Sequence, residues 1–372
     1  MKCTQSCKKK IFTPGLAAAL VLPVLLLAAF RLARSSRTFI NGWVFGVAAP
    51  LEQAMGCFWS LLPFSAAELL TALFLAGNAA WLVWTAVRGV RGAGWRQVLR
   101  RLLALAAAWL WLWCGLCWLW NGAYYADTFA QRAGLETGAY SVEELTSVTA
   151  WFARQAAALS DEVARDGEGR FDESLEDCFA EGPEIYENLA EEFPCLDIPS
   201  VRAKPLVCSR LQSILGFTGV YFPFTGEANV NVDAPACLVP ATIAHEMSHQ
   251  RMVASELEAN FVGIAACVTS DSTVFQYSGY LMGLIQLCNA LYPVDAQAWQ
   301  DIVQSCFTAE LAADWNENNA YWAALESPVS DGAEQVYDSF LKGNDQELGI
   351  RSYGACVDLL MAYFLPAAAG GA

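Results

Sequence analysis

The chain has 372 residues and a formal net charge of −16, and 55% of its residues are hydrophobic. The charges are unevenly distributed: residues 1–120 carry 12 basic and 2 acidic side chains, whereas residues 121–372 carry 10 basic and 36 acidic ones. This asymmetry indicates two physically different parts that join near residue 121. The acidity of the second part makes nucleic acid and acidic substrates poor partners, so no nucleic-acid binding is expected.

The first part contains three uncharged apolar runs, each about as long as is needed to cross ~30 Å of hydrocarbon. The runs predict membrane spans at about residues 14–33, 66–88 and 102–120, so that residues 1–121 form a three-helix anchor in the lipid bilayer. The first run also has the basic front and apolar middle of a signal peptide, although no convincing cleavage site follows it. No charged residue lies within the apolar runs themselves (Pro14–Phe30, Leu69–Val87 and Leu102–Trp120), which argues against a transporter.

The region between the first two runs, residues 39–64, is apolar but is interrupted by glycine, proline, asparagine and glutamate. It is predicted to be an interfacial or re-entrant segment. Nine lysines and arginines lie before the first run or between the second and third, against three after the first run. By the positive-inside rule, the N-terminus is cytoplasmic and residues 122–372 are extracytoplasmic, as in a multi-pass protein of the cell membrane.

Residues 122–372 are enough for one large domain. Ser141 and Glu144 have the spacing of a capping box, and a helical apolar period follows them. The clearest strand signal covers residues 219–232, where a proline and a glycine indicate a bent or edge pair of strands, with a turn at residues 226–229. The pattern is helical again from Pro240 to Phe364. The predicted fold of this domain is mainly α with a small β-sheet, of the α+β class.

Eight of the thirteen cysteines lie in this second part. An even number of cysteines outside the cell permits disulfides, but the pairing cannot be read from the sequence. Small buried hydrophobic side chains are an equally good interpretation.

Both histidines of the chain fall within one word, His245-Glu246-Met247-Ser248-His249. On a helix, residues four apart share a face, so two imidazoles can bind one metal ion. The glutamate after the first histidine can then act on a metal-bound water. These residues predict a zinc site with His245 and His249 as ligands and Glu246 as the catalytic base.

The third ligand must be a carboxylate or a thiolate, because the chain has no further histidine. Glu256 and Glu258 are the nearest candidates, at the start of a helix that Ser255 would cap. Glu256 is preferred, because it shares a face with small residues that would allow close packing against the histidine helix, and Glu258 remains the alternative. Asn260, one turn beyond Glu256, is a candidate to orient a histidine ring.

The arrangement of His245, His249, Glu256 and Asn260 resembles that of gluzincin peptidases, and a small sheet just before the metal helix resembles the layout of zincins. Several segments together also resemble a bacterial membrane-protein family catalogued as domain of unknown function 3810. These segments are Pro223–Asn229, His245–Arg251, Glu258–Phe261, Ser352–Gly354 and Val357–Leu360. That family usually has glycine where Met252 stands, so the geometry of the turn after the histidines is open to change here.

The resemblance implies a zinc-dependent, peptidase-like site, with a peptide or protein as substrate, in a zincin-like domain. In the expected mechanism Glu246 takes a proton from zinc-bound water as that water attacks a peptide carbonyl. Tyr221 and Tyr353 are candidates for oxyanion or substrate contacts. A non-catalytic or degenerate zinc centre in a membrane-bound sensor or binding module is the alternative interpretation.

Overall fold

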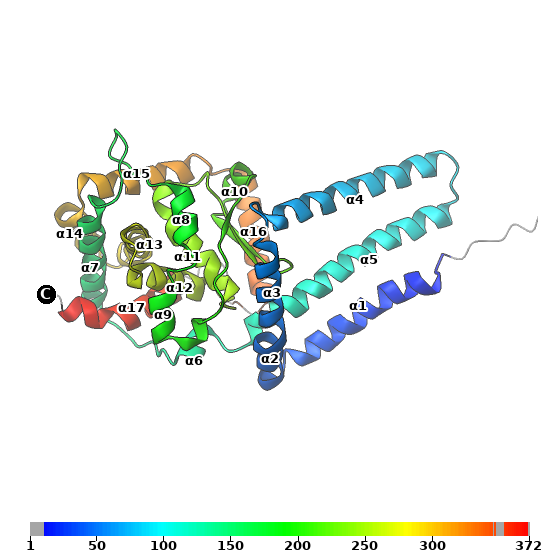
Figure 1. The fold of residues 1–372 in the computed structure, drawn as a ribbon, viewed down its shortest axis with the longest axis horizontal. Coiled ribbons are helices and arrows are strands. Elements are labelled where there is room, and N and C mark those ends of the chain that lie inside the picture. The colour runs from blue at the N-terminus through cyan, green and yellow to red at the C-terminus, as the bar shows by residue number, and fades with distance from the viewer. Residues whose placement is uncertain (1–10, 345, 347–352, 371–372) are drawn as a thin grey trace, which may run out of the picture.

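The computed structural model describes residues 11–344, 346 and 353–370, with the side chains of 353–355 left aside. Three of the described helices are long and apolar enough to cross a membrane: α1 (Pro14–Ala33), α4 (Ala66–Val90) and α5 (Trp95–Leu119). They project together from one side of a larger helical body (Figure 1). Helices that could span a membrane therefore lie where the three spans are predicted, although α5 begins seven residues before the predicted start because its helix continues through the arginines that precede the apolar run.

Tryptophan side chains join these helices. The indole N–H groups of Trp111 and Trp118 donate to backbone carbonyls of α1 at 3.0 and 3.1 Å. Between α4 and α5, Trp109 donates to the Asn78 side chain at 2.8 Å and Trp81 donates to the Arg101 carbonyl at 3.0 Å. Such bonds satisfy polar groups that a hydrocarbon surrounding cannot satisfy.

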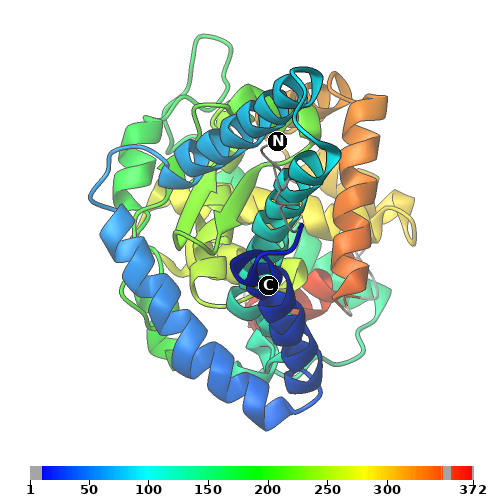
Figure 2. The ribbon, with the colours of Figure 1, turned by 90° about the vertical axis from the view of Figure 1, so that its right-hand side faces the viewer.

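The segment between α1 and α4 is helical nearly throughout. It consists of α2 (Arg37–Trp43), a π-helical turn (Val44–Ala48) and α3 (Ala49–Trp59). These helices run across the ends of the spans, beside the helical body (Figures 1 and 2). None of these helices reaches the length of a span by itself, and their transverse course is the one expected of an interfacial segment.

The rest of the chain is mainly helical around one hydrophobic core, as predicted, and α7, α11, α12, α13 and α17 pack against one another at its centre. Helix α7 begins at the predicted capping box, in which Ser141 and Glu144 exchange side-chain and backbone hydrogen bonds. The α-helices of this part are α6 (Phe129–Ala133), α7 (Val142–Ser160), α8 (Leu175–Glu181), α9 (Glu187–Glu192), α10 (Ser209–Leu215), α11 (Val239–Gln250), α12 (Glu256–Thr269), α13 (Thr273–Leu291), α14 (Ala296–Cys306), α15 (Ala309–Ala323), α16 (Pro328–Gly343) and α17 (Tyr353–Gly370). Short 3-10 helices cover Asn121–Tyr125, Pro194–Leu196 and Ala236–Leu238.

The sheet has three strands, β1 (Lys204–Pro205), β2 (Gly219–Phe222) and β3 (Glu227–Val230), in the order β1-β3-β2. Strand β3 is parallel to β1 and antiparallel to β2, with Gly219 opposite Val230 and Phe222 opposite Glu227. The predicted pair of strands is therefore confirmed, and β2 is an edge strand among the described residues. The predicted turn at 226–229 is wrong beyond Gly226, whose φ is 66°, because the next three residues pair and are buried.

The first turn of α4 is bound to this sheet. The Glu227 carboxylate accepts the Ala66 and Ala67 N–H groups at 3.1 and 2.7 Å, and it pairs with Lys204 Nζ at 2.6 Å. Both charged side chains are buried, and the Lys204 ammonium also donates to the carbonyls of Trp59, at the end of α3, and Phe64, just before α4. A carboxylate at a helix N-terminus satisfies N–H groups that have no partner within the helix. The start of α4 is thus fixed relative to β3.

None of the cysteines that the structure describes forms a disulfide. Cys178, Cys237, Cys267, Cys288 and Cys356 are buried within the helical body. These five cysteines therefore act as small buried hydrophobic side chains, which is one of the two interpretations of the sequence.

Candidate metal centre

Helix α11 carries the two histidines through the centre of the protein. It begins at Val239 with Pro240 in its first turn, where proline is tolerated, and all of its residues are buried. The rings of His245 and His249 lie one turn apart, with centroids 4.9 Å from each other and planes nearly perpendicular. The two histidines therefore share one face of α11, as predicted.

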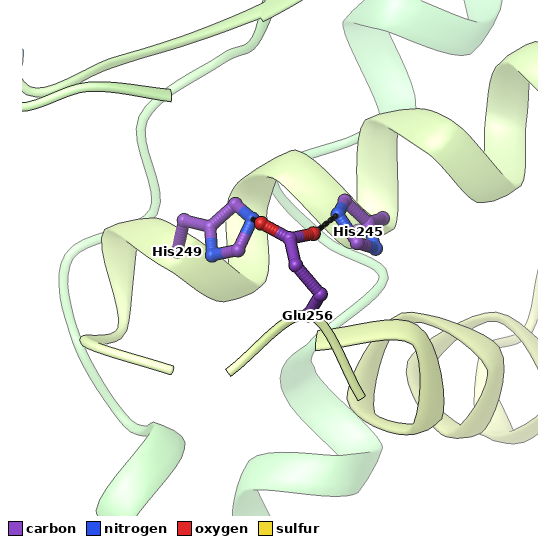
Figure 3. A group of neighbouring side chains, drawn as sticks. All are labelled: His245, His249 and Glu256. Carbon is purple, nitrogen blue, oxygen red and sulfur yellow. Dashed lines mark ion pairs between the residues drawn. The ribbon is translucent and has the colours of Figure 1, made fainter. Parts of the chain in front are cut away.

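Glu256, the first residue of α12, places its carboxylate between the two rings (Figure 3). Its Oε2 atom lies 3.3 Å from His245 Nε2, and its Oε1 atom lies 3.8 Å from His249 Nε2. One ligand atom from each of the three residues lies within 4.8 Å of the other two. The three side chains form a group that could hold a metal ion.

Small residues on α12 allow this close approach. Ala259 is fully buried, and a Cβ atom on Gly263 would lie 2.8 Å from the His245 backbone nitrogen. Any larger residue at position 263 would push α12 away from α11 and withdraw Glu256 from the histidines. The expected packing of small residues between the two helices is therefore present.

The turn between the helices holds His249 in one tautomer. Its Nδ1 atom lies 2.7 Å from the Val253 carbonyl oxygen, which can only accept, so Nδ1 carries the proton and Nε2 faces Glu256 with a free lone pair. Met252 makes this turn with φ = 56°, a left-handed conformation that favours glycine. The turn thus has the geometry that glycine would adopt, although methionine occupies it.

Glu258 is turned away from the metal group and has a structural role. Its carboxylate accepts the Phe129 and Ala130 N–H groups at 2.8 and 2.9 Å, at the start of α6. Ser255 is the N-cap residue of α12, as predicted, but its side chain makes no capping hydrogen bond. The geometry therefore favours Glu256 as the third ligand.

Asn260 lies beside His245, in the predicted position, and contributes to raising the pKa of that histidine. The His245 Nδ1 atom nevertheless has no hydrogen bond of ordinary geometry. Asn260 is therefore a neighbour of the ring and does not hold it firmly in place.

Glu246 is buried next to the metal group, and its Oε2 atom has no hydrogen-bond partner. Burial raises the pKa of this carboxyl to about 8. Gly219, at the start of β2, lies directly against it: a Cβ atom there would be 2.4 Å from Glu246 Oε1. Strand β2 can pass over Glu246 only because residue 219 has no side chain.

The other charges of the group favour metal ligation. Burial lowers the pKa of His249 to about 4, which keeps that ring neutral. Burial opposes ionisation of Glu256, but the two histidines and Tyr337 outweigh it and lower the pKa of this carboxyl to about 2. Glu256 in turn raises the pKa of His245 against the effect of burial. An ionised carboxylate beside imidazoles is the form that binds a metal cation.

Two aromatic residues, Tyr337 and Trp120, complete the site without any signal in the sequence. Tyr337 on α16 donates a hydrogen bond to Glu256 Oε1, and the Trp120 ring meets the His249 ring edge-on at 5.5 Å. Tyr221 lies beside His249, with ring centroids 6.3 Å apart, but its hydroxyl donates to Glu52 of α3 at 2.5 Å. The side chain of Tyr353 lies outside the described residues.

The family model described as "Protein of unknown function (DUF3810)" matches residues 46–361. The chain belongs to this family. The matched region begins just before α3, and it includes two of the three spans and the whole metal group. No curated protein and no solved structure matches the chain. The family description assigns no activity, so the chemistry of the site must indicate the function.

Proposed function

We propose that this chain is a membrane-anchored, zinc-dependent metallopeptidase that hydrolyses a peptide bond. The observation that carries the proposal is the convergence of His245 Nε2, His249 Nε2 and the Glu256 carboxylate. Two imidazoles and one carboxylate are the protein ligands of many catalytic zinc sites, in which a fourth position stays open for water or substrate.

The residues around this group support the proposal of hydrolysis. Bound zinc would supply a Lewis acid and lower the pKa of its water ligand. The positive charge of the zinc would also lower the raised pKa of Glu246, so that its carboxylate could take the proton from the attacking water and pass it to the leaving amine. Its Oε2 atom has no competing hydrogen bond, and Gly219 leaves room for the carboxyl group. A purely structural zinc site needs no carboxyl group in this position.

Strand β2 would align the peptide. The Asn231 N–H donates to the Thr218 carbonyl at 2.9 Å, so in the alternating antiparallel pattern the peptide groups of Gly219 and Tyr221 point away from β3. An extended peptide can pair with such an edge. Tyr221 is a poor oxyanion donor in this arrangement, because its hydroxyl already bonds to Glu52.

We assign the site to the outer side of the cell membrane. The helical body meets the end of α1, the start of α4 and the end of α5 (Figure 1). In the sequence the nine basic residues precede α1 or lie at or near the connection between α4 and α5, so the positive-inside rule assigns the opposite ends of the spans to the cytoplasm. The peptide or protein substrate would then be met outside the cytoplasm.

The experiment compares Glu246→Gln with Glu334→Gln, a matched change at an exposed residue of α16. The full-length variants and the wild-type chain are purified in detergent, loaded with zinc and incubated with a peptide library. We expect Glu246→Gln to keep about one zinc per chain and to lose at least about 100-fold in cleavage, the scale of a general base. The Glu334→Gln variant should cleave as the wild type does.

Three results would overturn the proposal. A wild-type chain that binds no zinc at neutral pH cannot have this mechanism. Equal cleavage by wild type and Glu246→Gln would assign the activity to a contaminant. Zinc binding without cleavage of any peptide would favour the non-catalytic sensor or binding module instead.

A further inference from the structure

The metal group opens into a large apolar cavity that continues between two membrane spans. The cavity has a volume of about 1130 Å³, more than a small-molecule pocket usually has. At one end it is lined by His245, Glu246, His249 and Glu256, and along its side by every residue of β2. At the other end it is lined by Leu70, Thr71, Leu73, Phe74 and Leu75 of α4 and by Trp109, Leu112 and Leu116 of α5.

The end of this cavity between α4 and α5 lies within the predicted hydrocarbon region, and the whole cavity is called the groove below. Phe74 and Trp109 meet edge to face at 5.0 Å and close the groove between α4 and α5. Trp109 lies ten residues before the end of α5, which corresponds to roughly 15 Å along the helix axis. The groove therefore extends from the metal group to about half the depth of a ~30 Å hydrocarbon layer.

Both walls of the groove are fixed to the catalytic side. Glu227 binds the first turn of α4, as described above. On α5, Gly115 accommodates the Phe224 ring so closely that a Cβ atom there would lie 2.8 Å from it. Phe224 lies two residues after the end of β2 and also lines the groove. The separation of α4 and α5 at this end (Figure 1) is thus built by contacts with the sheet.

We propose that the groove admits the apolar, membrane-inserted segment of a polypeptide substrate from the bilayer. The peptide bond to be cleaved then lies just outside the hydrocarbon, beside β2 and Glu246. A polypeptide fits better than a phospholipid because the apolar groove continues along the hydrogen-bonding edge of a strand, which recognises a peptide backbone. This inference rests on the proposed peptidase activity and specifies its substrates as membrane-tethered polypeptides.

The test uses the full-length, zinc-loaded chain in vesicles of phosphatidylethanolamine and phosphatidylglycerol. Two quenched-fluorophore peptides carry the same cleavable sequence, taken from the library hits, and one of them also carries an apolar segment of about 20 residues. We expect the tethered peptide to be cleaved at least about tenfold faster at equal total concentration, because remote binding energy positions the reacting bond. Cleavage of both peptides at the same rate would overturn the inference and leave the peptidase proposal standing.

Two variants on α4 locate the effect. Leu70→Trp places an indole in the groove, whereas Leu82→Trp makes the same change at an exposed position outside it. The preference for the tethered peptide should fall about tenfold in Leu70→Trp and should persist in Leu82→Trp, with zinc content and thermal midpoint checked for both. Equal preferences in the two variants would contradict the groove assignment.

A binding measurement separates failure of the groove from failure of catalysis. The tethered peptide carries a photo-crosslinker in its apolar segment, and it is irradiated with Glu246→Gln, which should bind without cleaving. Adducts at residues 70–75 and 109–116 would show that the groove binds the peptide. If these adducts form but no peptide is cleaved, only the peptidase proposal is refuted. Labelling of these residues by a phospholipid with the same crosslinker in its acyl chain, but not by the peptide, would assign the groove to lipid and overturn the inference.

Discussion

Separate replacement of Glu256 and Glu258 by glutamine should give two different phenotypes, although the residues are only two positions apart. Glu256→Gln keeps the size of the side chain but removes the negative charge between the histidines. Loss of an outer partner of a metal ligand already costs about 10–100-fold in affinity, so we expect zinc to bind more than about 100-fold more weakly here.

Glu258→Gln should keep zinc and lose stability. The carboxylate accepts one buried and one partly buried N–H group at 2.8 and 2.9 Å, and hydrogen bonds to a charged group contribute roughly 1.5–3 kcal/mol each. Glutamine retains one acceptor and turns an NH₂ group toward the other N–H, so the cost is roughly 2–3 kcal/mol. For a domain of this size, the thermal midpoint should fall by roughly 5–10 °C.

The assay is thermal unfolding of the full-length chain in detergent, with and without a chelator, together with zinc content by elemental analysis. The ligand assignment fails if Glu258→Gln loses zinc while Glu256→Gln retains it. The capping argument fails if Glu258→Gln unfolds at the wild-type temperature. A chelator should shift the midpoint of wild type and Glu258→Gln, and it should have little effect on Glu256→Gln.

Three further outcomes are expected. Tyr337→Phe removes the hydroxyl that bonds to Glu256, so zinc should bind about tenfold more weakly in a competition titration, and unchanged affinity would contradict this role. Met252 has a positive φ, so Met252→Gly should be about 0.5–1 kcal/mol more stable than Met252→Ala in a chemical denaturation. Both changes remove the buried side chain, but only glycine relieves the backbone strain. The reverse order of stability would show that the backbone is not strained there. Burial raises the pKa of Glu52 well above its ordinary value, so folding favours the neutral carboxyl group. The free energy of unfolding therefore falls as the pH rises from the ordinary pKa toward the pKa of the folded state. Glu52→Gln should flatten that decline in thermal midpoints measured between about pH 5 and 8, and an equally steep decline in both proteins would exclude Glu52 as its source.

The elements that sequence patterns predicted well are those with local signals. Long uncharged runs predicted the three spans, and a capping box predicted the start of α7. Helical spacing placed His245 and His249 on one face and favoured Glu256 over Glu258, because small residues share its face. Each of these inferences depends on residues within a few turns of one another.

The contacts that sequence analysis missed join residues that are far apart. Tyr337 reaches Glu256 across 81 positions, and Tyr221 reaches Glu52 across 169. Glu227 is a further example. The sequence from Gly226 to Asn229 has the pattern of a turn, but Glu227 begins a buried strand and its carboxylate binds the start of α4. No local pattern encodes these partners, since each depends on how the spans meet the sheet.

The binding of α4 to the sheet also constrains the order in which the protein can mature. The Lys204–Glu227 pair is buried, and it needs N–H and carbonyl groups from residues 59–67 to satisfy it. A buried ion pair that lacks these partners is costly, so a fragment that begins at residue 122 should fold poorly. In a newly made chain the sheet and the metal group beside it should therefore form only after α4, the second span, lies next to the sheet. If the chain has the peptidase activity proposed above, insertion would then prevent cleavage by chains that have not yet reached the membrane, because their site would be incomplete.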